Sequence, residues 1–114
     1  MMAARDLLET LFEAWQAHDA LRASACFAPD AVYCEAGGAE VMGRAAITDH
    51  FARFFREGPP WRFEVDEVFG EGDRVAVAYR FGVKGAGETW SDRAGCAIVG
   101  LEGGLVRRWR EYHG

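Results

Sequence analysis

The hydrophobic pattern of this chain changes once, at Gly58-Pro59-Pro60. Before this break, apolar residues recur every three or four positions, which is the period of an amphipathic helix. After it they alternate with polar residues, which is the period of a half-buried strand. Because the helices come first and the strands later, the sequence predicts an α+β fold whose helices pack on one face of an antiparallel sheet.

Three helices are expected before the break. The first begins near Asp6, and Asp19 is placed to cap a shorter second helix that ends before Pro29. The third follows Gly43 and ends at Gly58, a residue typical of helix termination. The apolar faces of the first and third helices consist of Leu7, Leu8, Leu11, Phe12 and Trp15, and of Ile47, Phe51, Phe54 and Phe55.

Glycine-rich turns divide the second half of the chain into four strands. The expected strands cover residues 61–69, 75–83, 89–101 and 105–112. Since the turns between them are short, consecutive strands are expected to pair as an antiparallel meander. One further short strand is expected at 32–35.

The strand at 75–83 is mostly apolar on both sides. One side carries Val75, Val77, Tyr79, Phe81 and Val83, and the other carries Ala76, Ala78, Arg80 and Gly82. Because three helices of this length cover one face only, we expect the outer face to bind a second copy of the chain in a homodimer. The alternative is a monomer whose outer face is shielded by long side chains such as those of Arg108 and Arg110.

Charge and composition exclude several classes of protein. The net charge is −5 and the basic residues are scattered, so no nucleic-acid partner is expected. No apolar run approaches the ~20 residues that span a bilayer, and the first residues lack the apolar core of a signal peptide, so we expect no membrane partner and a cytoplasmic location. The 114 residues fit a single domain over 1–114. No His or Cys spacing indicates a metal site, and no cofactor is expected.

Three segments resemble a known family. They are Phe27-Ala28-Pro29-Asp30-Ala31-Val32-Tyr33, Gly43-Arg44-Ala45-Ala46-Ile47, and Val106-Arg107-Arg108-Trp109-Arg110-Glu111-Tyr112. Together they resemble the SnoaL-like branch of the nuclear transport factor 2-like superfamily. The resemblance implies a cone-shaped fold, in which a curved antiparallel sheet wraps around three N-terminal helices and leaves a deep pocket for a small apolar molecule. The superfamily includes isomerases, cyclases, hydrolases, dehydratases and proteins without known chemistry, so the resemblance alone does not define a reaction.

Tyr33 and Glu35 lie on one side of the short strand, because side chains alternate along a strand. If this side faces an aromatic-lined pocket, burial is expected to raise the pKa of Glu35 toward values useful for a general base. Ketosteroid isomerase-like proteins have a catalytic carboxylate at this position. Their oxyanion-binding residues correspond to Leu11 and Cys96 here, so steroid isomerase activity itself is not expected.

Limonene epoxide hydrolase-like proteins are similar at other positions. The resemblance implies that Tyr33 binds water, that Arg80 is the central arginine, and that Glu111 is the distal acid. Glu35 replaces an asparagine of those proteins and Gly82 replaces their second acid. An epoxide hydrolase-like reaction therefore requires Glu35 to take over the missing role.

Arg80 is expected on the pocket side, paired with Glu35 or Glu111, as a structural salt bridge or as a ligand anchor. Either Asp92 or its neighbour Arg93 is expected to face inward. The histidines are expected at the surface or behind the site. Ligand contacts are expected from Trp15, Phe51, Phe55, Asp92 and Trp109.

Two hypotheses about function follow. In the first, the chain is a cofactor-independent acid-base enzyme, isomerase-like or cyclase-like, acting on a small apolar carbonyl or polyketide-like compound. Glu35 is then the base, while Tyr33 and Arg80 hold developing negative charge. In the second, the chain is a non-catalytic ligand-binding or dimeric interaction domain, and Glu35, Arg80 and Glu111 form a satisfied buried network.

Overall fold

Three helices form where the helical period predicts them. In the computed structural model, which describes residues 4–113, they are α1 (Ala4–Gln16), α2 (Ala20–Ser24) and α3 (Arg44–Glu57). The Asp19 carboxylate accepts the Arg22 backbone N–H at 3.0 Å, which confirms the predicted cap of α2. Gly43 precedes α3 with φ at 91°, a conformation that glycine adopts without strain. No helix within residues 4–113 is long and apolar enough to cross a membrane.

The strands form a single six-stranded sheet of order β2-β1-β6-β5-β4-β3. They are β1 (Phe27–Cys34), β2 (Glu40–Met42), β3 (Trp61–Glu71), β4 (Arg74–Lys84), β5 (Trp90–Glu102) and β6 (Leu105–His113). The predicted meander is confirmed, because β3 to β6 pair antiparallel in sequence order.

The sheet is not antiparallel throughout. β1 pairs with β6 in parallel, so that Tyr33 lies beside Trp109. The two strands are separated by most of the chain, and no local turn signal reports how such distant strands pair. β1 begins earlier than expected and runs through Pro29. The short strand β2 was not predicted, because three residues are too few to show an alternating pattern.

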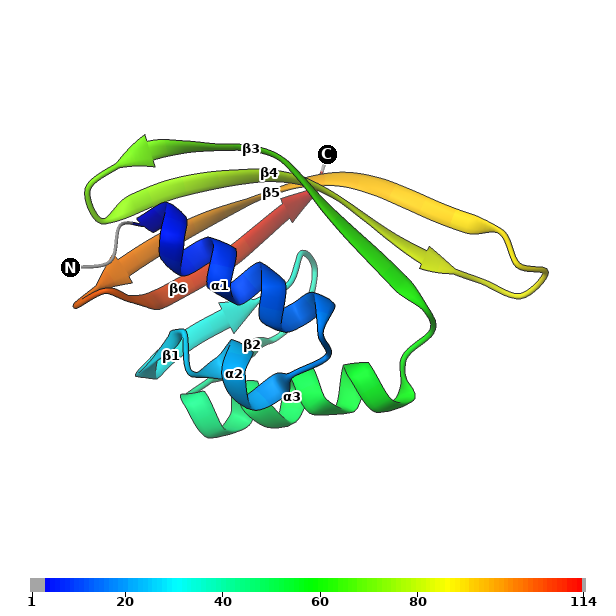
Figure 1. The fold of residues 1–114 in the computed structure, drawn as a ribbon, viewed down its shortest axis with the longest axis horizontal. Helices are drawn as coiled ribbons and strands as arrows, with labels where there is room; N and C mark the ends of the chain where they lie inside the picture. The colour runs from blue at the N-terminus through cyan, green and yellow to red at the C-terminus, as the bar shows by residue number, and fades with distance from the viewer. Residues whose placement is uncertain (1–3, 114) are drawn as a thin grey trace.

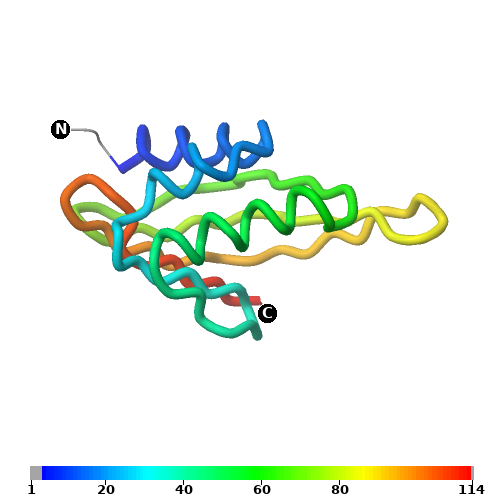
Figure 2. Tube along the Cα trace, turned by 90° about the horizontal axis from the view of Figure 1, so that it is seen from below, coloured from blue at the N-terminus to red at the C-terminus, as the bar shows by residue number. Residues whose placement is uncertain are grey.

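The helices lie on the concave side of the sheet (Figure 1). A bulge between Val65 and Glu67 interrupts the register of β3 with β4, and such bulges increase strand bending. The hairpin of β4 and β5 extends past the helices as an arm (Figure 2). This arrangement confirms the predicted α+β fold with a curved sheet and helices on one face.

The core lies between α1 and the inner face of the sheet. Leu8 and Leu11 of α1 are fully buried, as are Val77 of β4 and Val99 of β5. Full burial of a side chain of this kind contributes roughly 1.5–3 kcal/mol. Beyond the end of this packed core, toward α3 and the C-terminal part of β6, the layers leave a cavity.

Candidate functional site

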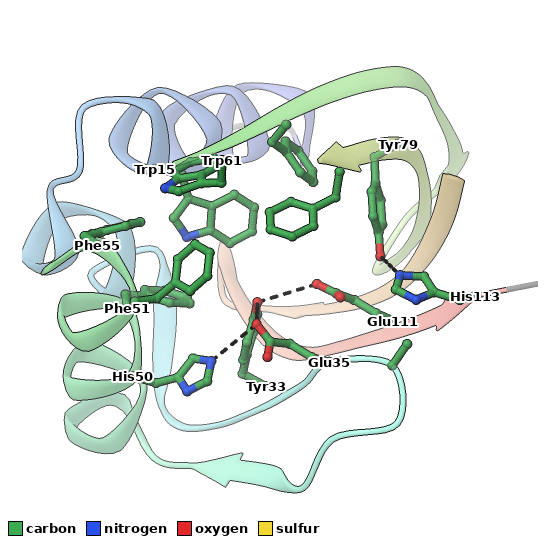
Figure 3. Close-up of a pocket in the computed structure, with 14 residues that line it drawn as sticks. Trp15, Tyr33, Glu35, His50, Phe51, Phe55, Trp61, Tyr79, Glu111 and His113 are labelled. Atoms are coloured by element: carbon green, nitrogen blue, oxygen red, sulfur yellow. Dashed lines mark hydrogen bonds and ion pairs between the residues drawn. The ribbon is translucent and has the colours of Figure 1, made fainter. Parts of the chain in front are cut away.

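A pocket of about 260 Å³ opens between the sheet and helices α1 and α3 (Figure 3). One part of its wall is aromatic, and the other part carries acids, phenols and imidazoles. The aromatic wall consists of Trp15, Phe51, Phe54, Phe55, Trp61, Phe63 and Phe81. The polar end, as we call it below, consists of Tyr33, Glu35, His50, Tyr79, Glu111 and His113.

Tyr33 stands between two carboxyl groups at the polar end (Figure 3). Its ring is buried, and its hydroxyl donates to Glu35 Oε2 at 3.1 Å and lies 3.5 Å from Glu111 Oε2. A phenol has one proton, so it donates to one of these acids at a time. Burial and the two nearby carboxylates raise the pKa of Tyr33, which therefore remains a donor. The predicted proximity of Tyr33 and Glu35 is present in the structure.

Glu35 lies at the rim of the pocket rather than at its closed end, and its side chain is 49% exposed. His50 of α3 lies close to it, with 3.3 Å between Nε2 and Glu35 Oε2. The hydrogen bond from His50 lowers the pKa of Glu35, and this effect outweighs the opposing effect of burial. The expectation of a raised pKa for Glu35 is therefore wrong, because the contact with His50 joins two elements that only the fold brings together.

Glu111 has the opposite environment. It projects from β6 into the pocket, and burial is the main cause that raises its pKa above the ordinary value. Trp109 donates its indole N–H to Glu111 Oε2 at 2.9 Å, and hydrogen bonds from Tyr79 and Tyr33 oppose the rise in the pKa of Glu111 without cancelling it. The site thus holds two carboxyl groups whose pKa values are moved in opposite directions.

Arg80 does not face the pocket. It lies on the outer face of the sheet, where Nη2 contacts Asp66 at 3.0 Å and Glu64 at 3.3 Å. The predicted pairing with Glu35 or Glu111 is wrong, because the alternate residues of β4, Val77, Tyr79 and Phe81, take the inner face. With Arg80 outside, the pocket lacks the central arginine that the resemblance to epoxide hydrolases implied.

Asp92 is also on the outer face, beside Gly82 on β4, and it pairs with Arg62 of β3 at 2.9 Å. The expected ligand contact of Asp92 is therefore wrong. Of the two neighbours, Arg93 shares the inner side of the sheet with Phe81, its partner in the β4–β5 register. Alternation along β5 explains why only one of them points inward.

The expected aromatic contacts are mostly in place. Trp15, Phe51 and Phe55 line the pocket. Trp109 does not, because it is fully buried behind the polar end, where it packs on Trp15 and Tyr33 and holds Glu111. Trp109 therefore supports Glu111 from behind and does not contact a ligand.

Sequence reasoning missed three polar residues of the pocket. His50 was expected at the surface or behind the site, but it lines the pocket next to Phe51 of α3. Tyr79 was counted with the apolar side of β4, although its hydroxyl lies 3.4 Å from His113 Nε2. His113 follows Glu111 by two positions on β6, and this period of two is the signal that could have found it.

The pair of His50 and Glu35 predicts a pH-dependent contribution to stability. The raised pKa of His50 stabilises the fold below its ordinary value of 6.5, and this contribution is lost as pH rises through the folded value. The lowered pKa of Glu35 stabilises the fold above its ordinary value of 4.5, and this contribution is lost as pH falls through the folded value. The pair therefore contributes most between pH 4.5 and 6.5.

Replacing His50 by glutamine is expected to reduce the free energy of unfolding by up to ~1 kcal/mol in that window, since the partly exposed pair is screened by solvent. Urea unfolding of both proteins at about pH 5.5 and about pH 9 measures the difference. A deficit that is equal at the two pH values contradicts the ion pair.

The curved six-stranded sheet, its three helices and the pocket between them define an α+β protein of the nuclear transport factor 2-like class. Within this class, the chain belongs to the SnoaL-like domain family, whose model matches residues 8–109. The predicted resemblance is confirmed. The chain has no significant match among curated protein sequences.

Solved structures share the fold at low sequence identity. A protein of ketosteroid isomerase-like fold from Catenulispora acidiphila, in complex with trimethylamine, has a TM-score of 0.85 and 19% identity over 99% of this chain and 88% of its own. A candidate polyketide cyclase from Sinorhizobium meliloti has a TM-score of 0.80 and 24% identity over 94% of each chain. An epoxide hydrolase of Mycobacterium tuberculosis that resembles limonene epoxide hydrolase has a TM-score of 0.80 and 18% identity over 95% of this chain and 80% of its own.

Proposed function

We propose that the chain is a cofactor-independent acid-base enzyme, cyclase-like or isomerase-like, that acts on a small and largely apolar carbonyl compound. The observation that carries this proposal is the pair of carboxyl groups at the polar end. Glu35 is held ionised by His50, whereas burial favours the protonated form of Glu111. Two carboxyl groups with opposite pKa shifts in one pocket are the usual arrangement of a base and an acid.

The reaction follows from these two protonation states. The aromatic wall binds the apolar body of the substrate and leaves its carbonyl group at the polar end. Glu35 takes a proton from the carbon next to the carbonyl, while Glu111 donates its proton to the carbonyl oxygen, so an enol forms. In an isomerase-like reaction, Glu35 then returns its proton to a different carbon of the enol, and the enol O–H returns its proton to Glu111. In a cyclase-like reaction, the enol carbon attacks a second carbonyl, whose oxygen takes the proton from Glu35, while the enol O–H again returns its proton to Glu111.

Tyr33 couples the two acids in this scheme. Its hydroxyl donates to Glu35 and lies near Glu111, so it can turn toward whichever group becomes negative. The similarity in fold to a candidate polyketide cyclase supports the cyclase-like form of the proposed reaction. An epoxide hydrolase reaction is less well supported, because Arg80 lies outside the pocket.

A second candidate function is a ligand-binding domain without chemistry. It is favoured by one observation: the donors Tyr33 and Trp109 already bond to carboxylates, which leaves neither free for a substrate oxyanion. In this case the pocket holds its ligand by apolar contact and Glu35, Tyr33 and Glu111 form a structural network.

Hydrogen exchange at the α-carbon of a ketone distinguishes these two functions. Propiophenone is a suitable probe, since it combines a phenyl ring with a carbonyl and exchanges its α-hydrogens slowly in neutral water. An acid-base enzyme is expected to speed their replacement by deuterium in D₂O, followed by proton NMR. If propiophenone binds, as shown by its line broadening, but exchanges at the rate of buffer alone, the binding domain is the better description.

We further propose that the chain forms a homodimer through the outer face of the sheet. Phe69 of β3 and Tyr112 of β6 are 52% and 53% exposed on this face. By register, small and apolar residues lie between them: Ala76, Ala78, Cys96 and Ile98. A face of this kind is expected to associate with a complementary apolar surface, and a second copy supplies one.

Light scattering is expected to give twice the chain mass of 12.6 kDa at micromolar concentration. Replacing Ala78 by arginine places a charge at the centre of this face and is expected to return the mass to that of one chain. Leu21→Arg is the control, because Leu21 is an exposed apolar residue on α2, away from the sheet face. A wild-type protein that is monomeric under these conditions contradicts the proposal.

A further inference from the structure

A row of three side chains crosses the inner side of the sheet toward Glu111, from Arg93 through His113 to Tyr79. Arg93 of β5 places Nη1 3.4 Å from His113 Nδ1, and His113 Nε2 lies 3.4 Å from the Tyr79 hydroxyl. Tyr79 and Glu111 both line the polar end, and Tyr79 is among the groups that lower the pKa of Glu111. Figure 3 shows Tyr79 and His113 meeting at the polar end, on the side of Glu111 opposite His50.

The chemistry of these groups fixes the direction of the hydrogen bonds. A guanidinium only donates, so Nδ1 of His113 must accept from Arg93. A neutral imidazole that accepts at Nδ1 carries its proton at Nε2, and this N–H points at the Tyr79 oxygen. Because the Tyr79 oxygen then accepts a hydrogen bond from His113, its own O–H is left to donate, and the Glu111 carboxyl lines the same end of the pocket.

Gly95 of β5 makes room for this row. It faces His113 in the register of β5 and β6 and faces Tyr79 in the register of β4 and β5. A Cβ at this position would lie 2.7 Å from both His113 Cδ2 and the Tyr79 hydroxyl oxygen. Real Cβ atoms do not approach other atoms so closely, so any side chain here displaces both partners.

We propose that Arg93, His113 and Tyr79 form a directed hydrogen-bond chain that ends on Glu111, and that Gly95 is the position that makes room for it. In this arrangement Arg93 and His113 are positioning residues, since they act through Tyr79. The role of these hydrogen bonds rests on the proposed function. They fix the orientation of Tyr79 toward Glu111, the acid that protonates the substrate carbonyl.

Other titratable groups also face Glu111, and they must stay unchanged in any test. Tyr33 and Glu35 approach from β1 and the residue after it, and His50 approaches from α3. The lining residue of α1, Trp15, does not titrate. A change in the titration of Glu111 is therefore informative only for variants that leave these three groups in place.

The tautomer of His113 tests the direction of the hydrogen bonds from Arg93 to Tyr79. In protein labelled with ¹⁵N-histidine, long-range proton-nitrogen spectra at alkaline pH distinguish Nε2–H from Nδ1–H, and His113→Gln identifies the signal. We expect the Nε2–H form in the wild type, a mixture of both forms in Arg93→Met, and recovery of the Nε2–H form in Arg93→Lys, which keeps a donor. An Nδ1–H form in the wild type, or no change in Arg93→Met, overturns the proposal.

The titration of Glu111, followed by carboxyl ¹³C NMR, tests the end of the chain. Gly95→Ala is expected to shift its midpoint to higher pH, since a displaced Tyr79 no longer donates. Gly100→Ala is the matched control on β5, where the nearest atom to a Cβ is 3.7 Å away. Tyr79→Phe replaces Gly95→Ala if that variant does not fold. Equal midpoints in the variant and the control overturn the proposal, and neither measurement depends on turnover, so the proposed function stands or falls separately.

Discussion

Replacing Glu35 by glutamine is expected to slow α-hydrogen exchange in bound propiophenone by about 10²- to 10⁴-fold, the usual contribution of a positioned general base. The amide keeps the size of the side chain but cannot take a proton at neutral pH. Glu111→Gln is expected to cause a loss of similar size, because the amide cannot protonate the carbonyl oxygen. The matched control is Glu64→Gln on the outer face, where the acid pairs with Arg80.

The pH dependence of the same exchange has a defined sign. The base must be ionised, so activity falls as pH drops through the lowered pKa of Glu35. The acid must be protonated, so activity falls as pH rises through the raised pKa of Glu111. The rate profile is therefore expected to be bell-shaped, with Glu35→Gln removing the acidic limb from any residual activity. Full exchange activity in both variants contradicts the assigned roles.

The architecture was predictable because local patterns specify it. The change of period at Gly58-Pro59-Pro60 separates α3 from β3, and the glycine-containing turns set the meander. The pairing of β1 with β6 was not predictable, because it joins distant segments. Local sequence reports what an element is, whereas the partner of an element depends on contacts that form only in the folded chain.

The two charged residues misplaced at the site, Arg80 and Asp92, share one physical origin for the error. Alternation shows which residues share a side of a strand, but it does not show which side faces the helices. On β4 both sides were apolar enough to be buried, so Arg80 was placed inside and Tyr79 with the core. For Tyr33 of β1 and Glu35 just after it, the expectation was conditional on the same point, and the structure places their shared side in the pocket.

The partners of the acids were hidden for a different reason. His50 reaches Glu35 from α3, and His113 reaches Tyr79 across the sheet. Each contact joins elements that only the fold brings together. The opposite pKa shifts of Glu35 and Glu111 arise from these contacts and from burial, so they could not be inferred from residue types alone.

Replacing Trp109 by alanine is expected to destabilise the fold by ~3–5 kcal/mol, the usual cost of truncating a fully buried aromatic side chain. The indole packs edge-on against Trp15 and Phe12, so its loss leaves a cavity between α1 and β6.

Trp109→Phe keeps part of this packing but removes the N–H that donates to Glu111, so it is expected to raise the pKa of Glu111 further while costing less stability. Urea unfolding measures the first effect and carboxyl ¹³C NMR the second. Trp90→Ala is the control, since Trp90 lies on the hairpin arm against Arg62 and is expected to cost much less. Equal losses at the two tryptophans contradict a role for Trp109 as the buried support of the acid.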